Sequence, residues 1–202
     1  MAEKKPRYIV GIDLGTTNCV VAYSEVTDQE GAGSSVAIFE ISQLVQAGLT
    51  AERSLLPSFI FLPGPHDVPE GSLELPWDSN NDSAVGEFAR ARGSEIPSRM
   101  IASAKSWLCN TAVDRNEKIL PWEGSPESKK LSPVEAQAYF LQHIRNAWNF
   151  TMASDDKGDR LEDQEILLTV PASFDAVARE LTVRAADQAG LPRVTLLEEP
   201  QA

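Results

Sequence analysis

A glycine- and threonine-rich segment near the N-terminus, residues 11–18 (GIDLGTTN), carries residue types that bind phosphate. Gly15 lets the main chain adopt a positive φ angle and approach a ligand without a Cβ in the way. Successive N–H groups of such a turn can converge on phosphate oxygens, and Thr16 and Thr17 add hydroxyl donors. Asp13 would repel a phosphate, so its natural partner is a hydrated divalent cation that bridges the phosphates. The segment therefore predicts one site for both phosphate and metal.

The same residue types also suit a plain β-hairpin. Glycine and threonine serve turn geometry, and Asp13 can cap the turn. The motif taken alone leaves both interpretations open.

The amino-acid composition limits the classes of ligand that the chain can be expected to bind. The chain has 202 residues, enough for one large domain or a lobe of two small subdomains, and 42% of them are hydrophobic. Thirty acidic against 18 basic side chains give a net charge of −12, which argues against a general nucleic-acid binder. Binding of ATP remains possible, because it needs only a few local donors and a divalent cation.

The cysteines and the N-terminus point to a reducing compartment. Cys19 and Cys109 belong to no CxxC pair and lie far in sequence from His66 and His143, so a structural zinc site has little support. No signal peptide and no apolar run long enough to cross a bilayer is evident. We expect a soluble, monomeric, cytoplasmic protein without a membrane or nucleic-acid partner.

The elements that must position the turn begin with strands. Residues 8–12 and 19–24 are apolar and rich in β-branched side chains, and residues 36–41 suggest a third strand of a meander. Residues 57–62 suggest another strand, the proline-rich residues 63–83 a long surface loop, and residues 86–92 a helix.

A long helix is predicted to begin at Ser132. Ser132 can cap it, Pro133 suits its first position and Glu135 completes a capping box. Apolar residues recur at helical spacing, at Val134, Ala138, Leu141, Ile144, Trp148 and Met152. The helix should end before the polar residues 155–159.

The last forty residues predict a strand, a helix and a second strand. Residues 165–170 form the first strand, Ser173 or Asp175 caps the helix, and Gly190 ends it. The expected apolar face of that helix consists of Phe174, Val177, Ala178, Leu181, Ala185 and Ala189. Residues 194–197 form the second strand, with Glu198 and Glu199 at its C-terminal end. Short connections imply a parallel pair, and hence a mixed sheet with helices against it.

Four segments in order resemble the nucleotide-binding domain of the seventy-kilodalton heat-shock (DnaK-type) chaperones. Residues 11–18 resemble the first phosphate-binding motif of the fold shared with actin and sugar kinases. The VGxxA and AxKxxL stretches of that family are resembled by residues 85–89 and 103–108. Its TVPAxF…R segment is resembled by residues 169–174 with Arg179, and its NEP motif by residues 198–200. Glu198 replaces the usual asparagine, Gln201 a threonine and Ser173 an aromatic residue. The resemblance therefore suggests a divergent, bacterial-like member.

The resemblance implies roles for single residues in ATP and Mg²⁺ binding. Asp13 would hold Mg²⁺ through water, and Gly15, Thr16, Thr17 and Asn18 would form the phosphate-binding turn. Lys105 would place its ammonium near the γ-phosphate and the attacking water, although taken alone it reads as an ordinary solvated lysine.

Three further roles concern the last part of the chain. Glu199 would orient water or the metal shell, with Glu198 a solvated neighbour. The residues matching Pro171 and Arg179 relay the nucleotide state in the family, whereas local rules explain them as a strand-ending proline and an exposed helical arginine.

The family also implies an architecture. We expect an α/β, actin-like (ribonuclease H-like) ATPase lobe with a mixed five-stranded sheet, flanking helices and a smaller inserted α+β subdomain. Residues 1–50 and 161–202 would form the core subdomain, and residues 51–160 the inserted one. The second lobe and the peptide-binding domain would be absent, so this lobe alone should bind ATP weakly and hydrolyse it very slowly.

The function implied is that of the N-terminal ATPase lobe of a chaperone that uses Mg-ATP to bind and release unfolded polypeptides. J-domain and nucleotide-exchange co-chaperones would be the further partners of the full-length protein. Two alternatives share the fold: a sugar or acetate kinase, and an actin-like polymerising ATPase.

Overall fold

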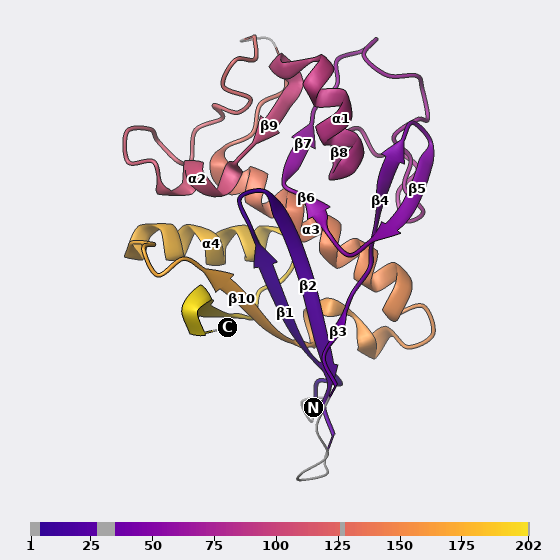
Figure 1. Cartoon of the computed structure of the whole chain (residues 1–202), viewed down its shortest axis with the longest axis vertical. Helices are drawn as coiled ribbons and strands as arrows, with labels where there is room; N and C mark the ends of the chain where they lie inside the picture. The colour runs from indigo at the N-terminus through magenta and orange to yellow at the C-terminus, as the bar shows by residue number, and fades with distance from the viewer. Residues whose placement is uncertain (1–4, 28–34, 126–127, 202) are drawn as a thin grey trace.

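A computed structural model describes residues 5–27, 35–125 and 128–201, and a mixed sheet forms its lower half (Figure 1). The sheet has six strands, and five of them follow one another in space in the order β11 (Val194–Glu198), β10 (Glu165–Val170), β1 (Tyr8–Leu14), β2 (Asn18–Glu25) and β3 (Ala37–Ile38). β1 runs parallel to β10 and antiparallel to β2, and β10 runs parallel to β11. The short strand β6 (Leu56–Pro57) pairs with the start of β2. The mixed sheet expected from the sequence is therefore present, but it has six strands rather than the five expected, because β6 joins it.

The alternation of side chains in β1 decides which face Asp13 occupies. Tyr8, Val10, Ile12 and Leu14 are buried, and Asp13 lies between the last two on the opposite, exposed face. Successive side chains of a strand point to opposite faces, so burying the apolar set obliges Asp13 to point away from the core.

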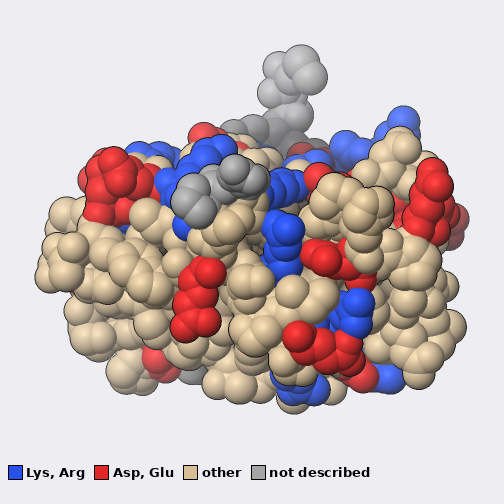
Figure 2. Space-filling model, turned by 90° about the horizontal axis from the view of Figure 1, so that it is seen from above, with Lys and Arg blue, Asp and Glu red and all other residues tan. Residues whose placement is uncertain are grey.

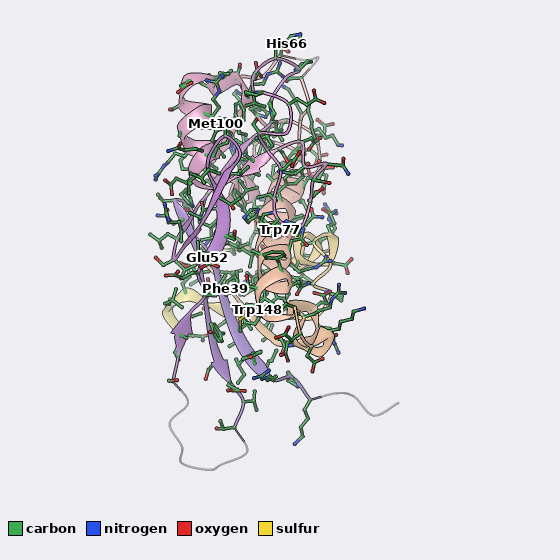
Figure 3. All side chains as sticks on the ribbon, turned by 90° about the vertical axis from the view of Figure 1, so that its right-hand side faces the viewer. Phe39, Glu52, His66, Trp77, Met100 and Trp148 are labelled. Carbon is green, nitrogen blue, oxygen red and sulfur yellow. The ribbon has the colours of Figure 1, made fainter. Side chains whose placement is uncertain are left out.

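Two helices cover the buried face of the sheet. They are α3 (Pro133–Met152) and α4 (Ala176–Gln188), and their apolar residues share one core with β1 and β10. The predicted capping box at the start of α3 is confirmed: the Ser132 hydroxyl accepts from the Glu135 amide, and the Glu135 carboxylate accepts from the Ser132 amide. Trp148 is fully buried, with its ring 5.1 Å from that of Phe39, and both lie between the sheet and α3 (Figure 3).

The upper half of the molecule consists of smaller elements (Figure 1). These are a hairpin of β4 (Ile41–Gln46) and β5 (Leu49–Arg53), a sheet of β8 (Ala84–Val85), β7 (Phe59–Phe61) and β9 (Met100–Ala102), and helices α1 (Glu87–Glu95) and α2 (Ala104–Cys109). Single 3-10 turns cover Pro97–Arg99, Lys157–Asp159, Leu161–Asp163 and Glu199–Gln201. The division of the chain into two subdomains stays a prediction.

Three details differ from the expectation. The strand expected at residues 36–41 is divided, because β3 ends at Ile38 and β4 begins at Ile41 in a different sheet. The strand expected at residues 57–62 is interrupted at Ser58, where the chain passes from one sheet to another. Val177 was expected on the buried face of α4, but it is exposed, and Thr182 and Ala186 are buried instead.

The surface carries charges of both signs. Figure 2, a view from above the upper half, shows Lys and Arg interspersed with Asp and Glu on that face. Within the described ranges, no helix combines the length and the apolar character that a membrane crossing requires.

Candidate functional site

An open hollow of about 340 Å³ lies where the β1–β2 turn, the helix α2 and the segment after β10 meet. Its lining residues are Asp13, Gly15, Thr16, Lys105, Ser106, Cys109, Pro171, Ser173, Phe174 and Glu199. Six of the residues singled out in the sequence belong to this set: Asp13, Gly15, Thr16, Lys105, Pro171 and Glu199. They come from four separate parts of the chain, and the fold brings them to one place.

The turn after β1 is held by two hydrogen bonds from Ser58. The Ser58 hydroxyl donates a 2.7 Å hydrogen bond to the Gly15 carbonyl oxygen, and the Ser58 amide donates a 2.8 Å bond to the Thr17 carbonyl oxygen. A Cβ on Gly15 would collide with the Asn18 carbonyl oxygen, so the compact turn requires glycine at this position. The positive φ angle expected at Gly15 was wrong, and the need for glycine comes from contact within the turn.

Asp13 is held by its neighbour strand. The Thr169 hydroxyl in β10 donates a 2.7 Å hydrogen bond to Asp13 Oδ1 across the parallel pair. This bond fixes the carboxylate at the rim of the hollow and leaves its other oxygen available to a ligand.

Lys105 is not a solvated lysine. Its side chain is 10% exposed, and its Nζ lies 2.6 Å from Glu199 Oε1, whose side chain is 44% exposed. Lys105 is the second residue of α2, and Ser103 before that helix has φ of 53°. Ser103 is the one non-glycine residue in the described ranges with positive φ, a conformation that costs energy in most residues. The backbone before α2 is therefore held in an unusual shape beside the residue that reaches the hollow.

The remaining predicted site residues lie outside the hollow. Thr17 and Asn18 do not line the hollow, and Asn18 pairs with Pro57 of β6. Arg179 lies on α4, and its Nη2 donates a 2.6 Å hydrogen bond to Glu198 Oε1. Glu198 is therefore not merely a solvated neighbour, because it forms an ion pair at the end of β11.

Three contributors were missed in the sequence. Ser58 and Thr169 hold the turn and Asp13, and Cys109 lines the hollow. Thr169 carried one signal, since it is the next-to-last residue of the strand predicted at residues 165–170, and in the structure it pairs with Asp13. Ser58 carried none, because its partners lie 41 to 43 positions away.

The two thiols differ in their surroundings. Burial raises the pKa of Cys19 to about 12, and its Sγ lies 3.5 Å from Ser58 Oγ. Cys109 is exposed, and partial desolvation raises the pKa of its thiol. At neutral pH both thiols are protonated, and only Cys109 is accessible.

The helix after the hollow begins with a charged cap. The Asp175 carboxylate accepts a 2.6 Å hydrogen bond from the Ala178 amide, and that bond with nearby Arg115 lowers the pKa of Asp175. Of the two predicted caps, Ser173 and Asp175, the second is the one used.

A magnesium ion fits the donors of the hollow only in a hydrated form. Asp13 offers one accessible carboxylate, and among the described residues no group of three or more His, Cys, Asp or Glu side chains could hold a metal ion. Mg²⁺ commonly keeps several waters and is bound through one or two carboxylates together with phosphates. Asp13 could therefore hold such an ion when a nucleotide supplies the remaining ligands.

Comparison with known proteins gives relatives over the whole chain. No protein-family model matches it. The chaperone protein HscA of Enterobacter sp. (strain 638) is 30% identical over 213 residues, and the HscA homologue of Herminiimonas arsenicoxydans is 31% identical over 217. The HscA homologue of Neisseria meningitidis serogroup B is 28% identical over 212 residues. Each alignment covers 100% of this chain and 28% of the relative.

The chain thus spans little more than a quarter of the length of these curated relatives. HscA is a chaperone of the seventy-kilodalton heat-shock type. The chain is a divergent relative of these chaperones, consistent with the N-terminal lobe of that family.

Proposed function

We propose that this chain is the first lobe of a chaperone ATPase with an actin-like fold, and that its hollow receives the terminal phosphates of a magnesium nucleotide. The observation that carries the proposal is the shared hollow of Asp13, Gly15, Thr16, Lys105 and Glu199. Turn amides, one buried ammonium and one rim carboxylate are the groups that phosphate and hydrated Mg²⁺ require.

Each residue has a distinct task in this proposal. The amides and hydroxyls of the turn bind phosphate oxygens, and Asp13 holds water on the metal. Lys105 supplies positive charge where negative charge develops on the transferred phosphoryl group. Glu199 now neutralises Lys105, and the phosphate would compete with it for the ammonium. Glu199, once released, would orient water.

The wider activity concerns a protein of the length of the curated relatives, of which this chain spans 28%. In the full-length protein, ATP hydrolysis would drive binding and release of unfolded polypeptides, with J-domain and nucleotide-exchange proteins as co-chaperones. The similarity to HscA supports this reading over a sugar or acetate kinase or a polymerising ATPase. One lobe offers one wall of the nucleotide cleft, so the isolated chain should bind weakly.

A titration followed by amide NMR tests the proposal. Mg-ATP should shift the resonances of Gly15, Thr16 and Lys105, with a Kd on the order of 0.1–1 mM, that is, a binding free energy of about −4 to −5.5 kcal/mol. Removal of Mg²⁺ should weaken binding at least tenfold. Lys105→Met should abolish the shifts, whereas Lys129→Met, which changes an exposed lysine paired with Asp82, should leave them intact. Equal shifts with and without Mg²⁺, or shifts confined to other residues, would refute the assignment.

A further inference from the structure

Ser58 lies at the junction of β6 and β7 and is 3% exposed. Both of its hydrogen bonds to the turn are made to carbonyl oxygens, those of Gly15 and Thr17. Its hydroxyl is uncharged, and Ser58 does not line the hollow. Ser58 is therefore placed to shape the turn without touching a ligand.

The geometry of the peptide bond gives these bonds a direction. In a trans peptide the C=O and the following N–H point to opposite sides. The only cis peptide of the described residues is Leu120–Pro121, so the Gly15–Thr16 peptide is trans. When Ser58 holds the Gly15 carbonyl oxygen, the Thr16 N–H is turned away from Ser58. Thr16 lines the hollow and Ser58 does not, so this orientation suits an amide that receives phosphate.

The same serine is also close in the fold to Lys105. The next residue, Phe59, pairs with Ala102 at the end of β9. Ser103 follows with its positive φ, and α2 begins with Ala104 and Lys105. In the view of Figure 1, the tip of the β1–β2 hairpin lies between α2 and β6, with β7 and β9 above it. The turn is therefore connected with Lys105 through the hydrogen bonds of Ser58, the pairing of Phe59 with Ala102, and residues 103–104.

We propose that Ser58 is a positioning residue, which orients the Thr16 amide and sets the turn in register with Lys105. The ligand in this inference rests on the proposed function. The effect of Ser58 on the turn can be measured without any ligand.

The test compares three variants of the full chain. Ser58→Ala removes the hydroxyl bond to Gly15, and Ser58→Thr retains a hydroxyl. Ser72→Ala is the matched control, because Ser72 is also buried and its hydroxyl donates a 2.6 Å bond to the Pro69 carbonyl oxygen, away from the hollow. Amide hydrogen exchange and thermal melting are measured without ligand, and binding of Mg-ATP and of magnesium tripolyphosphate is measured by NMR titration.

Ser58→Ala should accelerate exchange at residues 15–18 and 103–105 and weaken both probes about tenfold, the loss that corresponds to one lost hydrogen bond of ordinary strength. Ser72→Ala should lower the melting temperature by a similar amount and change neither readout. Ser58→Thr should restore binding toward the wild-type value. If Ser58→Thr does not fold, the comparison of the two alanine variants decides the matter alone.

Two results would overturn the inference. The first is that Ser58→Ala matches Ser72→Ala both in amide hydrogen exchange and in affinity for the two probes. The second is that amide exchange rises in Ser58→Ala without any loss of affinity. If the wild-type chain binds neither probe, the proposed function fails. In that case the exchange comparison still decides whether Ser58 orders the turn, and the role of Ser58 toward a ligand falls with the function.

Discussion

Lys105 Nζ and Glu199 Oε1 lie 2.6 Å apart, although 94 positions separate the two residues in the chain. The lysine is nearly buried and the glutamate nearly half exposed. The two partners should therefore respond differently to substitution.

Glu199→Ala should destabilise the chain by about 1–2 kcal/mol, since it leaves a buried ammonium without its counter-ion. Lys105→Met should change the free energy of unfolding by less than about 1 kcal/mol, because the carboxylate that remains is solvated. Urea denaturation of both variants measures the difference. A larger loss for Lys105→Met would contradict this account of the pair.

Gly15→Ala should disturb the turn, and Gly11→Ala, in the preceding strand β1, should not. A Cβ at Gly15 collides with the Asn18 carbonyl, whereas a Cβ at Gly11 would lie 3.9 Å from the Ala22 carbonyl oxygen. We expect Gly15→Ala to cost about 1–3 kcal/mol and to weaken Mg-ATP at least tenfold. Denaturant melts and the NMR titration report the two effects. Equal behaviour of the two variants would show that the turn has room for a side chain.

His143 should make the fold sensitive to mild acid. It is buried, and burial lowers its pKa to about 4, while its Nε2 donates to the Ser42 carbonyl oxygen, 3.0 Å away. The unfolded chain binds a proton near pH 6.5 and the folded chain does so only near pH 4, so the unfolded state binds more protons between these values. Stability contributed by the neutral ring is complete above pH 6.5 and falls as the pH drops toward 4.

At about 1.4 kcal/mol for each pKa unit, the loss should reach about 3 kcal/mol. The measurement is the free energy of unfolding of wild type and His143→Gln between pH 4 and 7.5. The difference between the two proteins removes the contribution of the carboxyl groups, including Asp175. A constant difference across this range would show that His143 does not titrate on unfolding.

Thiol reagents should separate the two cysteines. Cys109 is exposed, whereas Cys19 is buried with a strongly raised pKa. A maleimide should modify the native chain once, at Cys109, and modify Cys19 only in denaturant, as mass spectrometry of peptides can show. Because Cys109 lines the hollow, a bulky adduct should block Mg-ATP. Cys109→Ser, treated in the same way, should retain binding.

Local patterns in the sequence predicted the elements well where short-range contacts decide them. The β1–β2 hairpin, the capping box of Ser132 and Glu135, and the cap at Asp175 all follow from residues within a few positions of one another. Val177 was misplaced because the apolar spacing of α4 admits more than one face. The packing of α3 against that helix buries Leu181 and Ala185, Ala178 packs with Val170 and Phe174, and Val177 remains in solvent.

The site was predictable only in part for the same reason. Asp13, Gly15 and Thr16 form a recognisable motif, and the resemblance to chaperones pointed to Lys105 and Glu199. The burial of Lys105 and the contacts of Ser58 depend on partners distant in sequence, which no local spacing encodes. The pairing of Glu198 with Arg179 likewise required the parallel strands to be in place.

Glu198 and Glu199 are adjacent, yet each forms an ion pair with a basic residue of a different helix. Glu198 is paired with Arg179 on α4, and Glu199 with Lys105 on α2. The end of β11 is thus anchored twice. An anion that draws Lys105 away would free a single side chain, because the neighbouring carboxylate still ties the backbone to α4. The response to such an anion would begin as a rotation about side-chain bonds, with the sheet acting as a fixed frame.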